Sequence, residues 1–165
     1  MQPQASPRES VPVRLATEAD RAEMIPLINA AFAIETFLAG TRTDMERLTE
    51  MMHKGKFLLA HNASGELIAS VYVESGNRRG YLGMLAVRPE LQGRGLGRAM
   101  VEAAEEYCRA FNCVEMKLTV LSLRPELPPF YRKLGYAETG TEDFRPSRPL
   151  QPGVDCYCIV MSKSL

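Results

Sequence analysis

A glycine-rich hexapeptide, Gln92-Gly93-Arg94-Gly95-Leu96-Gly97, lies between an apolar, strand-like stretch and an amphipathic, helix-like stretch. Glycines allow left-handed backbone angles and let a ligand come close to the main chain. A helix that begins here would add free amide groups and the positive end of its dipole. Arg94 and Arg98 add positive charge. The loop is therefore suited to binding a phosphate or pyrophosphate through its backbone; the alternative is a glycine-rich turn that binds nothing.

Two common phosphate-binding motifs do not fit this loop. A Walker loop would end in Gly-Lys followed by Ser or Thr, and the sequence has no such ending here. A dinucleotide fingerprint needs a further glycine where Arg98 stands, counted from Gly93, or where Met100 stands, counted from Gly95. Glu115 begins its predicted strand, whereas a ribose-binding acid should lie at the carboxyl end of one.

The elements around the loop predict a parallel crossover. Residues 81–87 are an apolar strand, residues 96–111 a long amphipathic helix and residues 114–121 another strand. Strand, loop, helix and strand in this order make two neighbouring parallel strands. The apolar face of the helix is predicted to consist of Leu96, Met100, Ala103, Tyr107 and Phe111, and the opposite face of Glu102, Glu105, Glu106 and Arg109.

The chain before the loop predicts two helices. Thr17 can cap the first, with Asp20 reaching back to it, and Pro26 should kink this helix or split it in two. Thr43 and Glu46 form a capping box for the second helix. The inward residues of that helix are predicted to be Met45, Leu48 and Met52.

The remaining strands alternate with turns. Residues 11–15 form a short first strand, and residues 57–61, 67–73 and 81–87 form an antiparallel meander. Residues 130–134 form a short helix that follows Pro128-Pro129 and ends at Gly135. The last strands are residues 136–139 and 156–161, joined by a long, proline-rich loop over residues 140–155. Long loops in compact domains are often functional, and the class is α/β or α+β.

Composition excludes several kinds of protein. The 165 residues fit one domain, predicted over residues 11–165 after a disordered polar tail over residues 1–10. The 20 basic and 20 acidic residues cancel, which argues against a nucleic-acid partner. No apolar run approaches the roughly 20 residues that span a bilayer. The N-terminus lacks the apolar segment of a signal peptide, so a cytoplasmic protein is expected.

Four cysteines are present: Cys108, Cys113, Cys156 and Cys158. Their spacings do not match a typical zinc site, so we predict buried free thiols in a reducing compartment and no metal site. A disulfide or metal framework is the alternative.

The glycine-rich loop resembles the coenzyme-A signature of the GNAT acetyltransferases, Gln/Arg-x-x-Gly-x-Gly/Ala, with Gln92, Gly95 and Gly97 at its fixed positions. Residues 84–91 resemble that family's fourth strand and its exit, and residues 130–136 resemble its late helix and turn. The resemblance covers most of residues 11–161. It implies a mixed, mostly antiparallel sheet of about seven strands, with a parallel crossover at the cofactor site and about four helices.

The resemblance also implies acetyl-coenzyme A as the cofactor. Backbone amides would hold its pyrophosphate at Gly93, Arg94, Gly95, Leu96, Gly97 and Arg98. The pantetheine arm would pair like an added strand with the main chain of Leu85, Ala86 and Val87. One amide of that strand would polarise the thioester carbonyl.

Tyr131 corresponds to the family's usual general acid. A tyrosine stays protonated at neutral pH and can donate to a departing thiolate; the alternative is an aromatic side chain that only packs. The amine must also lose a proton. Glu74 and Glu35 are candidate bases, each of which could instead be a solvated charge, and Tyr81 is a weaker candidate.

One position departs from the family. Arg124 stands where an Asn often bonds the pantetheine arm, and Ser122 could take over that contact. Arg124 could instead face the substrate pocket and pair with a carboxylate, or lie on the surface. Residues 124–127 resemble a subset of family members at this place. The predicted acceptor contacts are Glu35, Tyr81 and Arg124.

Residues 32–44 and 140–155 are expected to flank the acceptor cleft. Acidic side chains in and beside these segments would favour a cationic amine, namely Glu35, Glu142, Asp143 and Asp155. Three arginines in the same segments oppose this interpretation, namely Arg42, Arg145 and Arg148.

The sequence therefore predicts an acetyl-CoA-dependent N-acetyltransferase that acts on a primary amine of a small molecule by direct attack in a ternary complex. A protein or peptide N-acetyltransferase is one alternative, and a CoA-binding sensor without turnover is another. A homodimer is compatible with the sequence.

Overall fold

The computed structural model describes residues 11–165, and the predicted tail at residues 1–10 lies outside the described residues. Seven strands form one mixed sheet in the order β1-β2-β3-β4-β5-β7-β6. Neighbouring strands are antiparallel except β4 and β5, which are parallel. The predicted fold class and the predicted parallel crossover are therefore confirmed.

The first half of the sheet is a meander of β1 (Val13–Leu15), β2 (Lys56–His61), β3 (Leu67–Gly76) and β4 (Arg79–Val87). The β3–β4 turn consists of Asn77 and Arg78, whose φ angles are both positive at 51° and 63°. Two such residues match the twist of a tight hairpin, so β3 runs three residues further than predicted.

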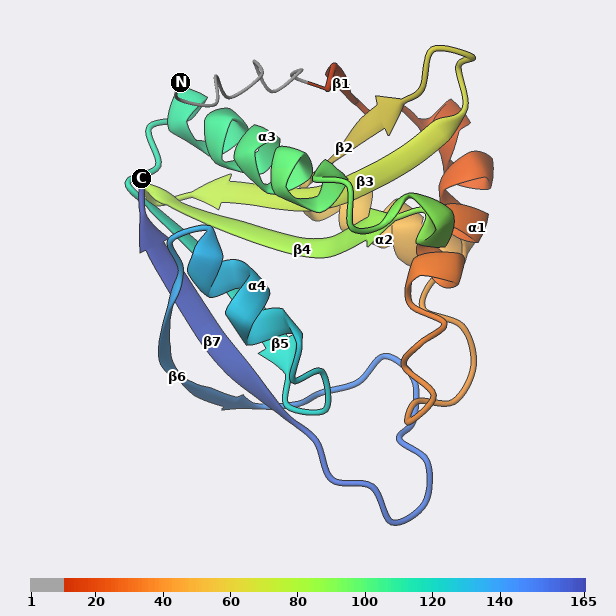
Figure 1. The fold of residues 1–165 in the computed structure, drawn as a ribbon, viewed down its shortest axis with the longest axis vertical. Coiled ribbons are helices and arrows are strands. Elements are labelled where there is room, and N and C mark those ends of the chain that lie inside the picture. The colour runs from red at the N-terminus through yellow and green to blue at the C-terminus, as the bar shows by residue number, and fades with distance from the viewer. Residues whose placement is uncertain (1–10) are drawn as a thin grey trace, which may run out of the picture.

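Strands β4 and β5 (Glu115–Leu121) lie side by side only at one end. Their pairing covers Arg79 to Tyr81 on β4. Beyond it, the register of β4 against β3 shifts between Ser70 and Tyr72, and Met84 has a φ of 47°. A bulge of this kind bends a strand, and Figure 1 shows β4 and β5 diverging away from their paired ends. The sheet is thus opened between two adjacent parallel strands.

Helices α1 (Arg21–Ala31) and α2 (Met45–Lys54) cover one face of the sheet. Pro26 lies inside α1 without splitting it, contrary to one of the predicted outcomes. The cap of α2 is Asp44, not Thr43, because its Oδ1 accepts a hydrogen bond from the Arg47 amide at 2.9 Å. Met45 was also wrongly predicted to face inward: as the first residue of α2 it is exposed.

Helices α3 (Leu96–Ala110) and α4 (Leu127–Lys133) cover the opposite face, toward the viewer in Figure 1. Two predictions for the faces of α3 were wrong. Phe111 is exposed just beyond the end of the helix. Glu105 is buried because its carboxylate accepts hydrogen bonds from the Tyr136 hydroxyl and the Lys163 ammonium, each at 3.0 Å.

The chain ends in β6 (Ala137–Asp143) and β7 (Tyr157–Ser164), which pair with each other. Strand β6 ends four residues later than predicted, so the long loop between them covers residues 144–156. Gly135, with a φ of 99°, follows α4 as predicted. All four cysteines are free, and Cys156 is only half-buried.

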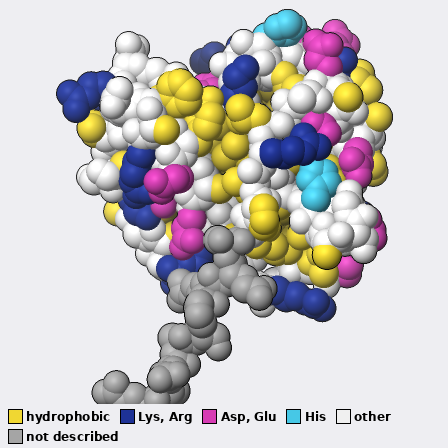
Figure 2. All heavy atoms as spheres, turned by 90° about the horizontal axis from the view of Figure 1, so that it is seen from above, with side chains coloured by type: hydrophobic (Ala, Val, Ile, Leu, Met, Phe, Trp, Pro, Cys, Tyr) yellow, Lys and Arg dark blue, Asp and Glu magenta, His cyan; other side chains and the backbone are white. Residues whose placement is uncertain are grey.

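Over residues 11–165, no helix has the length and apolar character needed to cross a bilayer, and no cluster of three metal-binding side chains occurs. Two small helices of the 3-10 type, η1 (Glu18–Asp20) and η2 (Pro89–Leu91), complete the elements. On the face drawn in Figure 2, acidic and basic side chains are interspersed and apolar side chains form a band between them.

Candidate functional site

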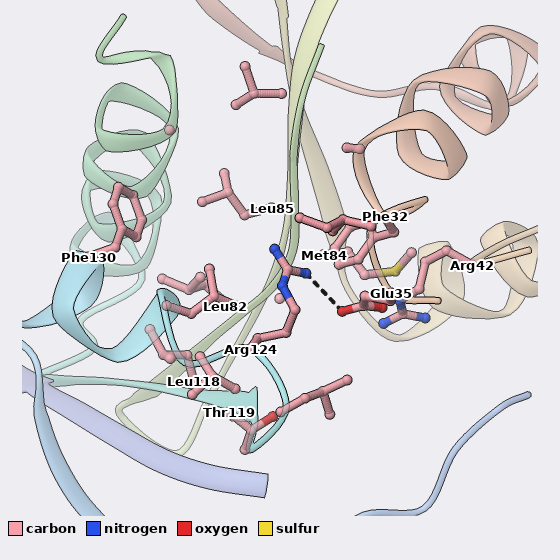
Figure 3. Close-up of a pocket in the computed structure, with 18 of the residues that line it drawn as sticks. Phe32, Glu35, Arg42, Leu82, Met84, Leu85, Leu118, Thr119, Arg124 and Phe130 are labelled. Carbon is pink, nitrogen blue, oxygen red and sulfur yellow. Dashed lines mark hydrogen bonds and ion pairs between the residues drawn. The ribbon is translucent and has the colours of Figure 1, made fainter. Parts of the chain in front are cut away.

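A cleft of about 820 Å³ lies where β4 and β5 part. Its walls come from both diverging strands, the starts of α3 and α4, the segment between α1 and α2, and the long β6–β7 loop. Figure 3 shows two different sides: Leu85, Leu82, Leu118 and Phe130 form an apolar side, and charged side chains from other segments face it. This volume is typical of a small-molecule site.

The glycine-rich loop forms one end of the cleft. Gly93 and Gly95 have left-handed φ angles of 78° and 86°, and a Cβ at either position would meet no atom within 4 Å. Gly95 is the N-cap of α3 and, having no side chain, cannot cap the first amides of the helix. These positions therefore give a strongly curved backbone with open space in front of it.

The amides of this loop have no partners in the described structure. Within residues 11–165, no hydrogen bond from the amides of residues 93–98 is present, and the first bond of the helix runs from the Ala99 amide to the Gly95 carbonyl at 3.0 Å. Free amides at a helix start and successive amides of a curved backbone both attract anions. Because the amides of residues 93–98 are unpaired among the described residues, this loop fits a pyrophosphate.

The side chains of the predicted phosphate loop are divided between the cleft and the surroundings. Gln92 and Arg98 line the cleft, where the Gln92 amide donates to the Val87 carbonyl at 3.2 Å and Arg98 pairs with Glu102 at 2.9 Å. Arg94 is exposed outside it. Leu96, the first residue of α3, packs against the core.

Strand β4 presents a free edge to the cleft. Beyond Tyr81 it has no partner on the β5 side within residues 11–165, so the main chain of residues 82–87 is open there. Leu85 and Val87 line the cleft, whereas Ala86 is buried on the other face beneath α1 and α2. An open edge of this kind can accept an extended ligand as an additional strand.

Tyr131 reaches the cleft from α4. Its ring packs edge-on against Phe130 and Tyr136, with ring centroids 4.9 Å and 5.8 Å away. Burial, and then the nearby Tyr81, raise the pKa of the Tyr131 hydroxyl well above its ordinary value, while the charge of Arg124 opposes the shift. The phenol is therefore a proton donor at neutral pH.

Glu74 does not line the cleft. Its carboxylate accepts a hydrogen bond from the Tyr72 hydroxyl, and its strand position is opposite Tyr81 on β4. Tyr81 does line the cleft, and burial raises the pKa of its hydroxyl. Glu74 is thus next to Tyr81 but outside the cleft lining, and the Tyr81 hydroxyl stays protonated at neutral pH.

Glu35 lies in the cleft wall but is not a free carboxylate. It is 4% exposed, and its two oxygens accept from Arg124 at 2.9 Å and from Arg148 at 2.8 Å. The dashed line in Figure 3 marks the contact with Arg124. Arg148 also donates to the Gly40 carbonyl at 3.1 Å. Glu35 therefore joins three distant segments, and Arg124 faces the cleft instead of the surface.

Ser122 lies outside the cleft lining. Its hydroxyl accepts a hydrogen bond from the Tyr157 amide at 3.1 Å, at the junction of β5 with β7. The predicted replacement for the usual Asn is therefore engaged elsewhere. Arg124 additionally pairs with Glu126 at 2.5 Å, which fixes its guanidinium at the entry to α4.

The acidic interpretation of the acceptor cleft is wrong. Glu142 pairs with Lys117 at 2.8 Å on the exposed strand β6, and neither Asp143 nor Asp155 lines the cleft. Among the described residues, the side of the cleft away from the glycine-rich loop is instead lined by two glutamates and five arginines, namely Glu35, Glu126, Arg42, Arg47, Arg124, Arg145 and Arg148. Arg47 was missed because its place in the amphipathic pattern of α2 is that of an ordinary surface residue.

Both segments expected to flank the acceptor line the cleft. The β6–β7 loop docks on the α1–α2 segment through hydrogen bonds from the Ala39 amide to the Pro149 carbonyl at 2.8 Å and from the Gln151 amide to the Phe37 carbonyl at 2.9 Å. Phe144 and Ser147 of this loop line the cleft. The loop is thus part of the site.

The family model described as the acetyltransferase (GNAT) domain matches residues 18–148 of the chain. Among solved structures, a ribosomal-protein-alanine N-acetyltransferase from Brucella melitensis is similar, with 18% identity, a TM-score of 0.74 and coverage of 94% of this chain and 100% of that chain.

Two further solved structures have the same fold. A spermidine N-acetyltransferase chimera from Vibrio cholerae and hSSAT has 18% identity and a TM-score of 0.73, over 94% of this chain and 96% of that one. A phosphinothricin acetyltransferase from Sinorhizobium meliloti, in complex with AcCoA, has 17% identity and a TM-score of 0.70, over 94% of this chain and 89% of that one. At these identities the likeness is one of fold.

Proposed function

The chain belongs to the GNAT acetyltransferase family, and on that premise we propose that it transfers the acetyl group of acetyl-coenzyme A to the primary amine of a small molecule. The transfer takes place by direct attack in a ternary complex. The observation that carries this proposal is the continuity of one cleft, from the free amides at residues 93–98, along the open edge of β4, to Tyr131.

The main chain holds the cofactor in this proposal. The amides of residues 93–98 bind the pyrophosphate, and Arg98 adds a positive charge beside them. The free edge of β4 at Leu85, Ala86 and Val87 pairs with the pantetheine arm. Gln92 supports both parts, because its side chain ties the loop to the carbonyl of Val87.

When bound, acetyl-coenzyme A supplies a thioester, so the acceptor nitrogen bonds to the acetyl carbon as the carbon–sulfur bond breaks. Tyr131 provides the proton for the departing sulfur, since Tyr131 lines the cleft and the raised pKa of its hydroxyl keeps that hydroxyl protonated. An amide of β4 donates to the carbonyl oxygen, where such a donor contributes about 2.7–4 kcal/mol to lowering the barrier.

The amine proton leaves by a less direct route. The two carboxylates of the cleft, Glu35 and Glu126, are both paired with arginines, which leaves neither free as a base. In this scheme a water molecule accepts the amine proton, and the proton then moves past Tyr81 toward Glu74. Glu74 is the residue opposite Tyr81 on the neighbouring strand β3. Glu74 acts in this scheme from behind the cleft wall.

The covered acceptor side favours a small molecule over a protein. Residues 144–156 dock on the segment between α1 and α2, where a peptide would otherwise need an open groove. By their names, the similar structures act on ribosomal-protein alanine, spermidine and phosphinothricin, so this fold accommodates both kinds of acceptor.

The proposal is tested by incubating the protein with acetyl-coenzyme A and a panel of small amines and measuring released thiol. We expect amine-dependent release that saturates with both substrates. Tight cofactor binding without release for any amine would instead support a sensor domain, and release only with protein N-termini or lysines would support the protein-directed alternative.

A further inference from the structure

The charges at the acceptor end of the cleft do not balance. Glu35 and Glu126 pair with Arg124 and Arg148. The arginines left over on that side are Arg42, Arg47 and Arg145, and none of these makes an ion pair within residues 11–165. Uncompensated guanidinium groups that are partly removed from water are costly unless an anion joins them.

Arg42 is held in the cleft by an aromatic neighbour. Its guanidinium carbon lies 5.2 Å from the centroid of the Phe32 ring, and Figure 3 shows its guanidinium near Glu35. Burial, followed by the like charge of Arg47, lowers the pKa of this guanidinium, and the charge of Arg148 acts in the same direction. The carboxylate of Glu35 opposes the shift but is occupied by two other arginines.

Arg47 lies beside Arg42 with an unsatisfied donor. Its Nε is buried and has no hydrogen-bond partner in the described structure. The same holds for the Nε of Arg148 on the facing loop. Buried polar atoms without partners are uncommon in native proteins, and a functional role or an ion that binds at the site is among the explanations for them.

Nearby carboxylates do not neutralise the charges of Arg42 and Arg47. Asp44, Glu46 and Glu50 line a hollow on the outer side of Arg42 and Arg47. All three are exposed, and none makes an ion pair with either arginine among residues 11–165. The pyrophosphate of the cofactor has a different proposed site, which is the glycine-rich loop at the start of α3.

We propose that the acceptor amine carries a carboxylate, or an oxyanion of similar size, and that Arg42 and Arg47 bind it. The inference rests on the proposed acetyl transfer and adds the substrate class. Two guanidinium groups form charge-assisted hydrogen bonds to both oxygens of such a group. The apolar residues of the same wall, Phe32, Ile34 and Leu38, leave room for a hydrophobic part of the acceptor.

The test compares α-amino acids with their carboxamides, which keep the amine and remove the negative charge. Binding of each pair is measured by calorimetry in the presence of coenzyme A, and kcat/KM is measured by thiol release. The proteins are wild type, Arg42→Gln, Arg47→Gln, Arg47→Lys and the control Arg109→Gln, which removes an arginine from the outer surface of α3.

We expect at least one amino acid to bind about tenfold or more tightly than its carboxamide, as charged hydrogen bonds allow. Arg42→Gln and Arg47→Gln should reduce the ratio of the two affinities, amino acid over carboxamide, toward one, while the affinity for acetyl-coenzyme A is unchanged. Arg47→Lys should retain part of the ratio, and Arg109→Gln should retain all of it. Because binding is measured without turnover, a carboxylate preference without thiol release would contradict the acetyl transfer and leave the anion site standing.

Three results would overturn the inference. The carboxamides could bind as well as the amino acids, the preference could survive in both glutamine variants, or no amino acid of the panel could bind at all. Each of these would mean that the arginines serve another purpose than holding an acceptor anion.

Discussion

At the scale of single residues, Tyr131 has the clearest chemical assignment. Its ring is held between Phe130 and Tyr136, and the residue lines the cleft. A tyrosine that burial keeps protonated can give a proton but cannot take one. This separates Tyr131 from the buried Tyr136, whose hydroxyl is engaged by Glu105.

Tyr131→Phe tests this assignment. We expect turnover to fall by roughly 10²–10⁴-fold, as is usual for loss of a general acid, while acetyl-coenzyme A binds with unchanged affinity. Tyr107→Phe on α3 is the matched control, since the Tyr107 ring packs against Phe111 away from the cleft, and it should leave turnover as it is. Equal turnover in the two variants would remove Tyr131 from the mechanism.

Single residues also show which features of the site could be predicted from the sequence and which could not. The glycine-rich loop and the Gly135 cap were predicted because their signals are local, and they adopt positive φ angles as expected. The contacts of Glu35 were not predictable in this way. Its partners Arg124 and Arg148 lie 89 and 113 residues away, and nothing in the local pattern around Glu35 indicates burial.

At the scale of elements, the curved loop before α3 depends on glycine conformation. Gly95→Ala places a side chain at a φ of 86° and in the open space in front of the loop, where we propose that the pyrophosphate binds. We expect calorimetry to show greatly weakened acetyl-coenzyme A binding, since the loop must distort to relieve the strain and its amides then lose their common direction.

Gly65→Ala is the control for backbone strain alone. Gly65 has a φ of 80° and equally open surroundings, but it lies in the β2–β3 turn away from the cleft. Both variants should lose a similar amount of stability, about 1 kcal/mol. If Gly65→Ala weakened cofactor binding as much as Gly95→Ala, the effect would be one of stability and the loop would lose its assigned role.

A second element-scale prediction concerns the docked β6–β7 loop, which Glu35 connects to the α1–α2 segment and to Arg124. Glu35→Gln leaves two arginines without their shared carboxylate. Removing one partner of a buried ion pair destabilises a protein by about 3–5 kcal/mol, so urea denaturation should show that the free energy of unfolding falls by an amount of this order. Glu142→Gln breaks an exposed pair with Lys117 and should cost about 1 kcal/mol or less. Similar losses in both variants would contradict a structural role for Glu35.

Element types and order were largely predictable, and their ends were less so. Strand β6 extends through Glu142 and Asp143, which carry no apolar signal because every residue of the strand is exposed. In α3, Glu105 could not be predicted as buried, since its partners Tyr136 and Lys163 come from later elements. Tertiary pairing thus overrode the local pattern in both cases.

At the scale of the whole molecule, one carboxylate links folding to pH. Hydrogen bonds from Arg14 and from the Thr17 amide hold the pKa of Asp20 well below its ordinary value, against the opposing effect of burial. A carboxyl with a depressed folded pKa contributes stability above its unfolded pKa of about 3.9, and this contribution is lost as the pH falls toward the folded value.

Asp20→Asn should therefore lower the free energy of unfolding at pH 7 by about 1 kcal/mol, because it removes the ion pair with Arg14 that joins β1 to the start of α1. Below about pH 4 the difference from wild type should shrink. Asp143→Asn, on exposed β6, is the control and should have little effect at either pH. A difference that stays constant with pH would show that the Asp20 charge is not responsible.

In the proposed function, two stretches of bare main chain bind acetyl-coenzyme A together, at residues 93–98 and along β4. Residue-resolved amide hydrogen exchange, measured with and without saturating acetyl-coenzyme A, tests both at once. We expect exchange to slow at the amides of residues 93–98 and within residues 82–87. Unchanged exchange in both stretches, in a protein saturated with acetyl-coenzyme A, would contradict the account.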